Sequence, residues 1–149
     1  MIDAALLGRL RDQADTDGIT QLVVGAVICD AERVLLLQRP DDDFMGGIFE
    51  LPSGKVDPGE ALDAALIREV KEETGLDTAE LVAYIDHFDY TSGSGKQSRQ
   101  FNFTVTVTAT DPITLTEHDT YTWIGITEQL PVTVAVENTL ASYRATQNA

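Results

Sequence analysis

The chain has 149 residues, of which 43% are hydrophobic and 23% are charged. This length favours one domain, over residues 1–149, and the composition excludes disordered and fibrous chains. Ten Lys and Arg residues against 25 Asp and Glu residues give a formal net charge of −15. That charge repels nucleic-acid backbones and anionic lipid, so we exclude a nucleic-acid-binding module and expect no membrane partner.

The chain also lacks the sequence features of a membrane or secreted protein. No apolar run approaches the roughly 18 to 20 residues that cross a bilayer. Residues 1–18 lack the basic-then-apolar order of a secretory signal, so we expect a cytoplasmic protein. Cys29 is the only cysteine. It can form no intramolecular disulfide and no cysteine-based metal cage, and we expect it to be a small apolar strand residue.

The N-terminal part predicts a helix followed by two strands. Residues 2–14 carry apolar side chains at helical spacing before a polar break at 15–18. The segments 22–29 and 33–38 are rich in Val, Ile and Leu, which is typical of a β-hairpin. Residues 41–59, rich in glycine and acid, then form a long connection, and connections of such length usually have a function.

The clearest helix spans residues 60–74 and ends at Gly75, in the position of a left-handed cap. The preceding Asp57, Pro58 and Glu60 suit either a helix start or a turn. Strands over 81–90, 100–110 and 121–126 follow, and a helix over 132–145 closes the chain. Strands interleaved with helices, yet containing hairpins, indicate an α+β fold with a mixed sheet covered by helices.

The helix over 60–74 carries an unusual set of acidic residues. At about 100° per residue, Leu62, Leu66 and Val70 form its apolar stripe. Glu69 and Glu73 fall within the same inward-facing sector, and Glu72 flanks it. The helix is therefore predicted to turn two carboxylates toward the protein interior.

One explanation is a solvated acidic face with intrahelical pairs, since Arg68 precedes Glu72 by four residues. That explanation does not account for two glutamates on the buried side, because carboxylates cost several kcal/mol to desolvate unless they are paired or bind cations. One arginine cannot neutralise three glutamates. A Mg²⁺ or Mn²⁺ site held by carboxylate oxygens resolves the conflict.

The spacing around this helix matches a known motif. Gly54 is followed after five residues by Glu60 and, after seven more, by the run from Arg68 to Leu76. Residues 54–76 therefore match the Nudix box at every defined position, and the chain resembles the MutT-like Nudix hydrolases. The resemblance extends upstream through 34–40, 46–47 and 50–54. It implies an α/β/α sandwich in which the box forms a loop, a helix and a loop that hold divalent metal.

The resemblance also implies roles for individual residues. Glu69, Glu72 and Glu73 would be metal ligands, together with the carbonyl group of Ser53, and either Glu69 or Glu72 would be the general base. A further acidic ligand from a distant loop would be Glu117, with Asp119 as its rival and a merely solvated loop acid as the alternative. The supporting residues would be Gly54, Glu60, Arg68 and Gly75.

Substrate contacts are expected outside the box. Arg39 is a candidate for binding phosphate, and the alternative is a surface arginine that pairs with residues 41–43. Phe44 is the candidate for stacking on a nucleobase, whereas Phe49, Tyr90 and Trp123 are expected in the core. His87 and His118 lack the spacing of a zinc site, so strand and loop polar roles are favoured for both. Assistance of a base near Glu117 is the alternative for His118.

The resemblance implies hydrolysis of a nucleoside diphosphate linked to another group, by water attacking phosphorus. We expect a Mg²⁺-dependent (or Mn²⁺-dependent) pyrophosphohydrolase that converts a nucleoside triphosphate to a monophosphate and pyrophosphate. Hydrolysis of a nucleotide sugar or dinucleotide polyphosphate is an alternative, and a non-catalytic nucleotide-sensing domain is another. The partner is a small nucleotide, and a homodimer is left open.

Overall fold

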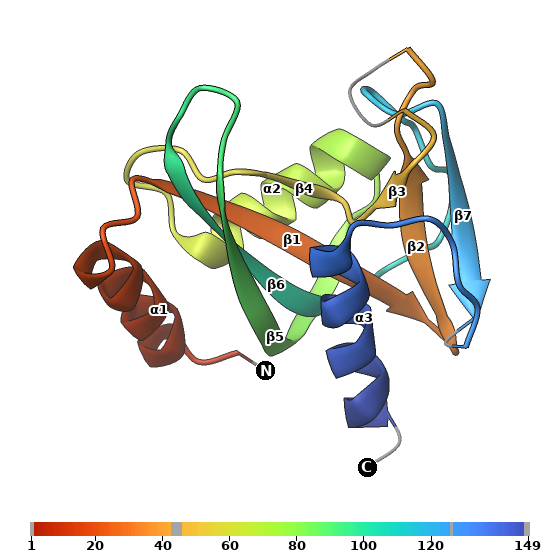
Figure 1. Cartoon of the computed structure of the whole chain (residues 1–149). Coiled ribbons are helices and arrows are strands. Elements are labelled where there is room, and N and C mark those ends of the chain that lie inside the picture. The colour runs from red at the N-terminus through yellow and green to blue at the C-terminus, as the bar shows by residue number, and fades with distance from the viewer. Residues whose placement is uncertain (1, 43–45, 126, 148–149) are drawn as a thin grey trace.

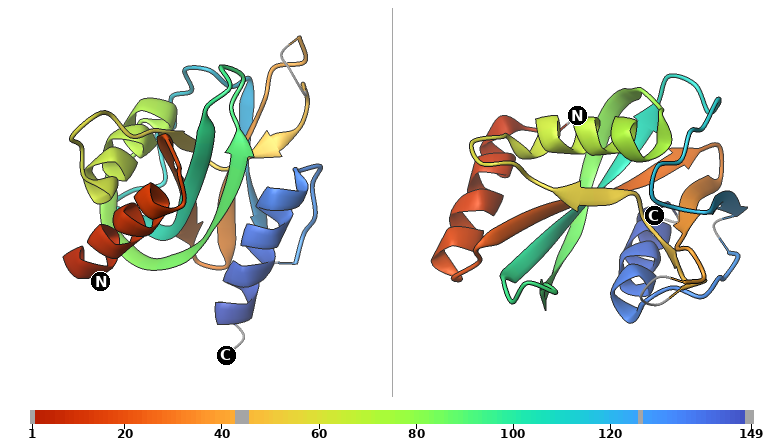
Figure 2. Two further views of the ribbon diagram at one scale, coloured as in Figure 1. Left: turned by 60° about the vertical axis from the view of Figure 1, so that its left-hand side comes forward. Right: turned by 90° about the horizontal axis from the view of Figure 1, so that it is seen from above.

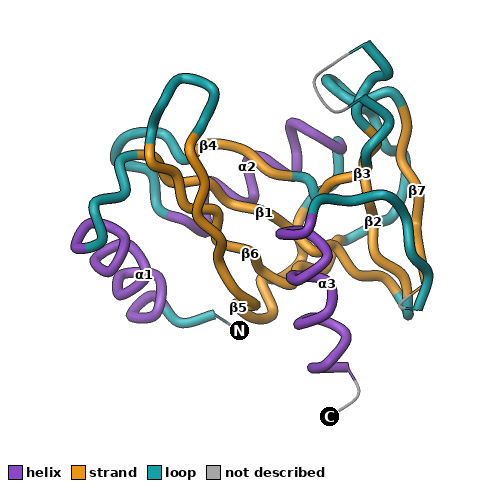
Figure 3. The backbone as a smooth tube through the Cα atoms, viewed as in Figure 1, coloured by secondary structure: helices purple, strands orange, loops and turns teal. Residues whose placement is uncertain are grey.

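The computed structural model describes residues 2–42, 46–125 and 127–147. Three helices and seven strands lie within these described ranges (Figures 1 and 3). In chain order they are α1 (Ala4–Thr16), β1 (Gln21–Asp30), β2 (Arg33–Gln38), β3 (Phe49–Glu50), β4 (Ser53–Lys55), α2 (Leu62–Thr74), β5 (Thr78–Thr91), β6 (Gln97–Val107), β7 (Thr120–Gly125) and α3 (Val134–Gln147).

Strand β1 lies at the centre of a mixed sheet. It pairs in parallel with β6, and antiparallel with β4 along its first half and with β2 at its end. Strand β5 extends the sheet beside β6, while β3 and β7 both pair with β2. The hairpin of β1 and β2 forms as predicted, but its register includes only Cys29 with Val34 and Asp30 with Arg33. The two strands then diverge, and β4 takes the place beside β1.

Helices cover both faces of the sheet, as the two core clusters show. In one cluster, Val24, Ala26 and Ile28 of β1 pack with residues of α1 and α2. In the other, Val27 of the same strand packs with residues of α3. Figure 2 shows α2 and α3 on opposite sides of the sheet. A sheet buried on both faces explains why β2 reads as a continuous apolar run, and the arrangement confirms the predicted α+β fold.

The predicted boundaries shift where local hydrogen bonds decide them. Helix α2 begins at Leu62 rather than at 60, because the Glu60 N–H donates to the Asp57 carbonyl at 3.0 Å and Gly59 has φ +79°, which makes a turn. Gly75 has φ +77° and its N–H donates to the Lys71 carbonyl at 2.8 Å, which confirms the left-handed cap. The connection over 41–59 contains the two short strands β3 and β4.

Other termini differ by a few residues. Helix α1 covers 4–16 rather than 2–14, since the Asp3 carboxylate accepts from the Ala5 N–H and caps it. Strand β5 begins at Thr78 rather than at 81, and β6 ends at Val107 rather than at 110. Among the described helices, none has the length and apolar character needed to cross a membrane.

Candidate active site

Helix α2 directs Glu69 and Glu73 toward the protein interior, as its periodicity predicts. Leu62, Leu66 and Val70 are fully buried and hold the helix against the sheet. The Glu69 side chain is then 13% exposed and that of Glu73 10%, whereas the side chain of Glu72 is 57% exposed. Two carboxylates lie on the packed side of the helix, and one lies at its edge.

Strand β4 passes directly beneath the first of these carboxylates. Its register aligns Gly54 with Val24 of β1, and a Cβ atom at position 54 would overlap the Glu69 carboxylate. Only glycine leaves that space free. Ser53, whose carbonyl group is a predicted metal ligand, directly precedes this glycine and aligns with Gly25.

Arg68 lies at the centre of the acidic cluster. Its Nε donates to one Glu60 oxygen and its Nη2 to the other, both at 2.8 Å. Its Nη1 donates to Glu69 at 2.8 Å and to Glu72 at 3.2 Å, and Nη2 also donates to the Lys55 carbonyl at 3.0 Å. The predicted supporting residues Glu60 and Arg68 are therefore in direct contact, next to the two glutamates.

The pKa values of these acids differ because their surroundings differ. The hydrogen bonds from Arg68, together with one from the Asp57 N–H, lower the pKa of Glu60 to about 2. Burial raises the pKa of Glu69, and it outweighs the opposing effect of Arg68. In the reverse direction, the hydrogen bond to Glu60 raises the pKa of the Arg68 guanidinium. Glu69 is thus a carboxylate whose charged form is disfavoured at its own site.

Sequence reasoning missed a second group of side chains at the other end of the cluster. His118 is 6% exposed, and its Nε2 donates to the Glu50 Oε1 at 2.7 Å. Its Nδ1 lies 3.3 Å from the Glu73 Oε2. Arg39 donates from Nε to the other Glu50 oxygen at 3.0 Å. Glu50 lies in the stretch 50–54 and His118 lies next to Glu117, but no periodic pattern predicts a contact between residues 68 positions apart.

These contacts govern the charges of the second group. Burial raises the pKa of Glu50, but the hydrogen bonds from His118 and Arg39 outweigh it, and the pKa is lowered. Burial also lowers the pKa of His118, and its contacts with Glu50 and Glu73 outweigh that effect and raise the pKa to about 9. The two carboxylates therefore favour the charged form of His118, and its polar role in a loop is as expected, although the loop holds it buried.

The loop that carries Glu117 docks along α2. The Thr116 hydroxyl donates to the Glu72 carbonyl at 3.2 Å, and the Thr114 N–H donates to the Thr74 carbonyl at 2.8 Å. Glu117 itself is exposed, and its rival Asp119 is exposed as well. The fold thus brings the predicted distant loop to the C-terminal half of the box helix, where Glu73 lies.

A cavity of about 570 Å³ opens beside this site. Its wall combines Arg39, which follows β2, and polar residues of β3 and β4 with aromatic residues of β5 and apolar residues of α3. The lining residues are Arg39, Glu50, Leu51, Ser53, Phe88, Asp89, Tyr90, Thr91, Ser92, Gly93, Gln100, Thr133, Ala135 and Val136. The expected core position of Tyr90 is wrong, because its side chain is exposed on this wall. Phe44, the predicted stacking residue, lies outside the described residues.

Gln100 and the aromatic pair define the inner part of this cavity. Phe88 and Tyr90 lie on alternate positions of β5 with ring centroids 6.2 Å apart. The Gln100 side-chain amide donates to the Asn102 Oδ1 at 2.8 Å, and this hydrogen bond holds the Gln100 side chain against the sheet. Arg39 lies near the box and pairs with Glu50. The cavity therefore offers both aromatic surface and a guanidinium along its wall.

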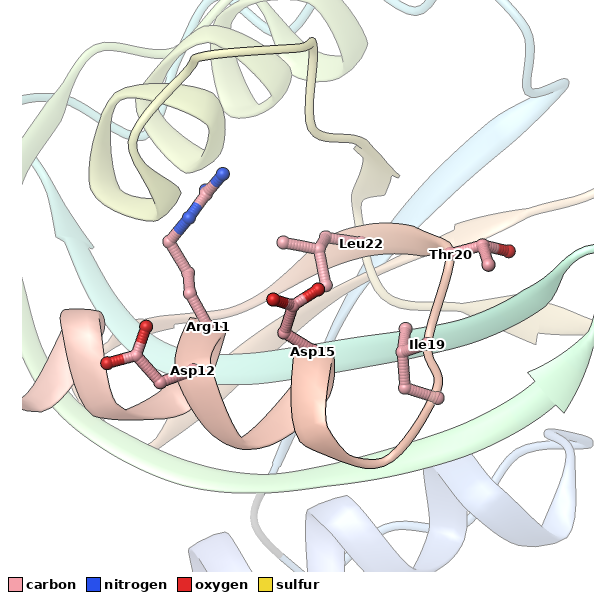
Figure 4. A pocket seen from close by; sticks show the side chains of 6 residues that line it. All are labelled: Arg11, Asp12, Asp15, Ile19, Thr20 and Leu22. Atoms are coloured by element: carbon pink, nitrogen blue, oxygen red, sulfur yellow. The ribbon is translucent and has the colours of Figure 1, made fainter.

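A smaller hollow of about 340 Å³ lies between α1 and the start of β1 (Figure 4). Arg11 extends from α1 across this hollow, and its Nη1 donates to the Glu60 carbonyl at 2.8 Å. This contact joins α1 to the turn that precedes α2. The hollow itself contains none of the predicted site residues.

The acidic residues fit a divalent cation in their chemistry. They supply oxygen donors from one helix, and the Glu73 Oε2 is buried without a hydrogen-bond partner. Within the described part of the chain, no three His, Cys, Asp or Glu side chains converge into a complete cage. Arg68 and His118 engage Glu69 and Glu73 instead.

The comparisons with known proteins agree with this geometry. A family model described as the NUDIX domain matches residues 19–141. An 8-oxo-dGTP diphosphatase from Proteus vulgaris is 41% identical over 59 residues, which are 39% of this chain and 53% of that protein. A CTP pyrophosphohydrolase from Escherichia coli (strain K12) is 42% identical over 55 residues, which are 37% of this chain and 41% of that protein. The matches thus span about half or less of these curated relatives.

The fold is similar to solved structures over most of its length. The solution structure of the E. coli ORF135 protein superimposes with a TM-score of 0.73 at 27% identity. The match covers 89% of this chain and 94% of that protein. The similarity of fold therefore extends beyond the short stretch found by sequence.

Proposed function

Because the chain belongs to the Nudix family, we propose that it is a metal-dependent pyrophosphohydrolase that cleaves a nucleoside triphosphate to a monophosphate and pyrophosphate. Nudix hydrolases generally use divalent metals. One observation carries the proposal. Two largely buried carboxylates, Glu69 and Glu73, lie on one helix, with Glu69 packed over Gly54.

In this proposal, oxygens of the box hold Mg²⁺ or Mn²⁺. The ligands are the carboxylates of Glu69, Glu72 and Glu73 and the carbonyl group of Ser53, and Glu117 is the ligand from the docked loop. When bound, the cation neutralises pyrophosphate charge and lowers the pKa of the attacking water. Arg68 keeps Glu69 and Glu72 close together.

A carboxylate of the same cluster acts as the general base. A water oxygen forms a bond to phosphorus, the bond from that phosphorus to the bridging oxygen breaks, and the carboxylate takes the proton from the water. Glu69 and Glu72 are the candidates. The Glu72 side chain is 57% exposed, so water reaches it, whereas burial raises the pKa of Glu69, which makes Glu69 the stronger base.

The cavity beside the box supports a nucleotide substrate. Phe88 and Tyr90 offer ring surface for a base, and Gln100 offers an amide for hydrogen bonds to the base edge. Arg39 lies at the box end of the cavity, where a phosphate group would pass. It also pairs with Glu50, so phosphate binding would compete with an existing ion pair.

Two relatives support a triphosphate substrate, because their names each include a nucleoside triphosphate, 8-oxo-dGTP in one and CTP in the other. Hydrolysis of a nucleotide sugar or dinucleotide polyphosphate is the second candidate. A nucleotide-sensing domain without activity is disfavoured, because Glu69, Glu72 and Glu73 are all present.

The test is release of pyrophosphate or phosphate from nucleoside triphosphates, nucleotide sugars and dinucleotide polyphosphates with Mg²⁺ or Mn²⁺. We expect triphosphates to yield pyrophosphate, Glu72→Gln to lose at least about 100-fold in turnover, and the control Glu32→Gln, on the exposed turn between β1 and β2, to keep it. Cleavage of another class alone would replace the substrate assignment. No cleavage, with a nucleotide that raises the melting temperature, would favour the sensing domain.

A further inference from the structure

His118 joins three parts of the site that are distant in sequence. Its ring lies in the loop before β7, one nitrogen contacts Glu50 of β3, and the other lies near Glu73 of α2. The imidazole therefore separates two carboxylates and contacts both. A loop side chain that is only 6% exposed is held in one orientation by these contacts.

The two carboxylates depend on His118 to different extents. Glu50 also receives a hydrogen bond from Arg39. For Glu73, His118 is the only cationic side chain within 4.0 Å among the residues that the structure describes. The two atoms are close but do not form a hydrogen bond. Both the His118 Nδ1 and the Glu73 Oε2 are buried without a hydrogen-bond partner.

We propose that His118 is a positioning residue for the metal site, which orients the Glu73 carboxylate through Nδ1 while Glu50 anchors its Nε2. This inference rests on the proposed function, because Glu73 has to be a metal ligand. Carboxylates that bind metals are themselves commonly held by a hydrogen bond to the second oxygen, and loss of that partner typically weakens metal binding about 10- to 100-fold. By the same contact, His118 keeps its neighbour Glu117 beside the box.

The two ring nitrogens allow the roles to be separated. In His118→Asn, the side-chain amide nitrogen can occupy the place of Nδ1 and still donate to Glu73. In His118→Gln, the longer side chain carries its amide nitrogen to the place of Nε2, toward Glu50. A residue that merely fills space would tolerate both changes equally, whereas a residue that orients Glu73 tolerates asparagine better.

The experiment is calorimetric titration of Mn²⁺ into the wild-type chain, the two variants and the control His87→Gln, with no substrate present. His87 is exposed and contacts Tyr84 at 2.9 Å, outside the cluster. We expect wild-type affinity for His87→Gln, a loss of less than about threefold for His118→Asn and a loss of about tenfold or more for His118→Gln. Unfolding in EDTA establishes beforehand that each variant is folded.

The outcomes are distinct. Equal affinity of wild type and His118→Gln, or equal losses in both His118 variants, would overturn the positioning role. Absence of Mn²⁺ binding by the wild-type chain would instead overturn the metal site of the proposed function. If His118→Gln does not fold, His118→Ala replaces it, because alanine also leaves Glu73 without a donor.

Discussion

Two arginine side chains, Arg68 and Arg99, each bind a group of carboxylates. The two groups differ in how many carboxylates share one positive charge. Around Arg68, carboxylate oxygens lie 2.8 to 3.6 Å from the guanidinium nitrogens. They belong to Asp57, Glu60, Glu69 and Glu72. One cation thus serves four acids, and burial still raises the pKa of Glu69.

Arg99 serves two acids and is more deeply buried. It is 6% exposed, donates from Nε and Nη2 to both Asp89 oxygens at 2.7 and 2.9 Å, and lies 3.0 Å from Asp17. The hydrogen bonds from Arg99 lower the pKa of Asp89. Both aspartates are partly exposed, so water also solvates them. This group joins the end of α1 to β5 and β6.

The difference separates a structural ion-pair group from a candidate site. In the Arg99 group one cation faces two partly exposed acids, and Asp89 is stabilised in its charged form. In the Arg68 group one cation faces four acids, and Glu69 is held where its charged form is disfavoured. Such a cluster gains from a further cation, and it costs stability without one.

The largest expected effect is that of Glu69→Gln on hydrolysis. We expect turnover to fall at least about 100-fold, because a ligand or base is lost. The free energy of unfolding in EDTA should stay within about 1 kcal/mol of the wild type or rise, since a neutral amide is cheaper to bury than a carboxylate. Pyrophosphate release and chemical denaturation check both parts. A large loss of stability would show that the carboxylate is structural.

Gly54→Ala should act on the same carboxylate from the other side. The added methyl group occupies the space of the Glu69 carboxylate, so we expect that carboxylate to move and turnover to fall about 100-fold. Gly8→Ala is the matched control, because Gly8 lies within α1 and has nothing within 4 Å of an added Cβ. The control should keep its activity and gain up to about 1 kcal/mol in stability. Normal turnover in Gly54→Ala would exclude the close packing.

Arg99→Met should lower stability and leave turnover unchanged, the reverse of the effect expected for Glu69→Gln. We expect the free energy of unfolding to fall by about 2 kcal/mol, since charged hydrogen bonds to Asp89 and Asp17 are lost. Turnover at saturating substrate should remain normal, because the group lies outside the box, whereas KM is expected to change, since Asp89 lines the cavity. Arg33→Met, which removes a half-exposed pair with Asp30, should cost less than about 1 kcal/mol. Loss of turnover in folded Arg99→Met would end the distinction between the two groups.

Local patterns predicted those parts of the fold that depend on neighbours in sequence. The periodicity of Leu62, Leu66 and Val70 predicted a buried helix stripe, and the same geometry placed Glu69 and Glu73 inward. The start of that helix was uncertain because Asp57 and Glu60 suit both a turn and a cap, and the structure has the turn. The strands β3 and β4 are too short to show a period, so β4 was expected as loop and β3 lies within residues 48–51, which only interrupt the predicted loop.

Contacts between distant segments could not be read from the sequence. His118 contacts both Glu50 and Glu73 only because β3, α2 and the loop before β7 lie together in the fold. No local sequence pattern predicts that these three segments meet. The exposure of Tyr90 could not be predicted either. Its strand position predicted burial, but β5 lines a cavity. The roles of Glu117 and Arg39 stay predictions, although the fold places both near the box.

The smallest expected effect is a pH dependence of stability from Glu60. Its pKa is lowered to about 2 in the folded chain from an ordinary value of 4.5, mainly by the hydrogen bonds from Arg68. A lowered pKa stabilises the fold above pH 4.5, and this contribution is lost as the pH falls from 4.5 toward 2. Glu60→Gln should therefore melt below the wild type at pH 7, and the difference should shrink steadily between pH 5 and pH 3. Asp89→Asn should follow the same direction, because the pKa of Asp89 is also lowered. A difference for Glu60→Gln that is constant across this range would show that Glu60 supports the turn through its shape and not through its charge.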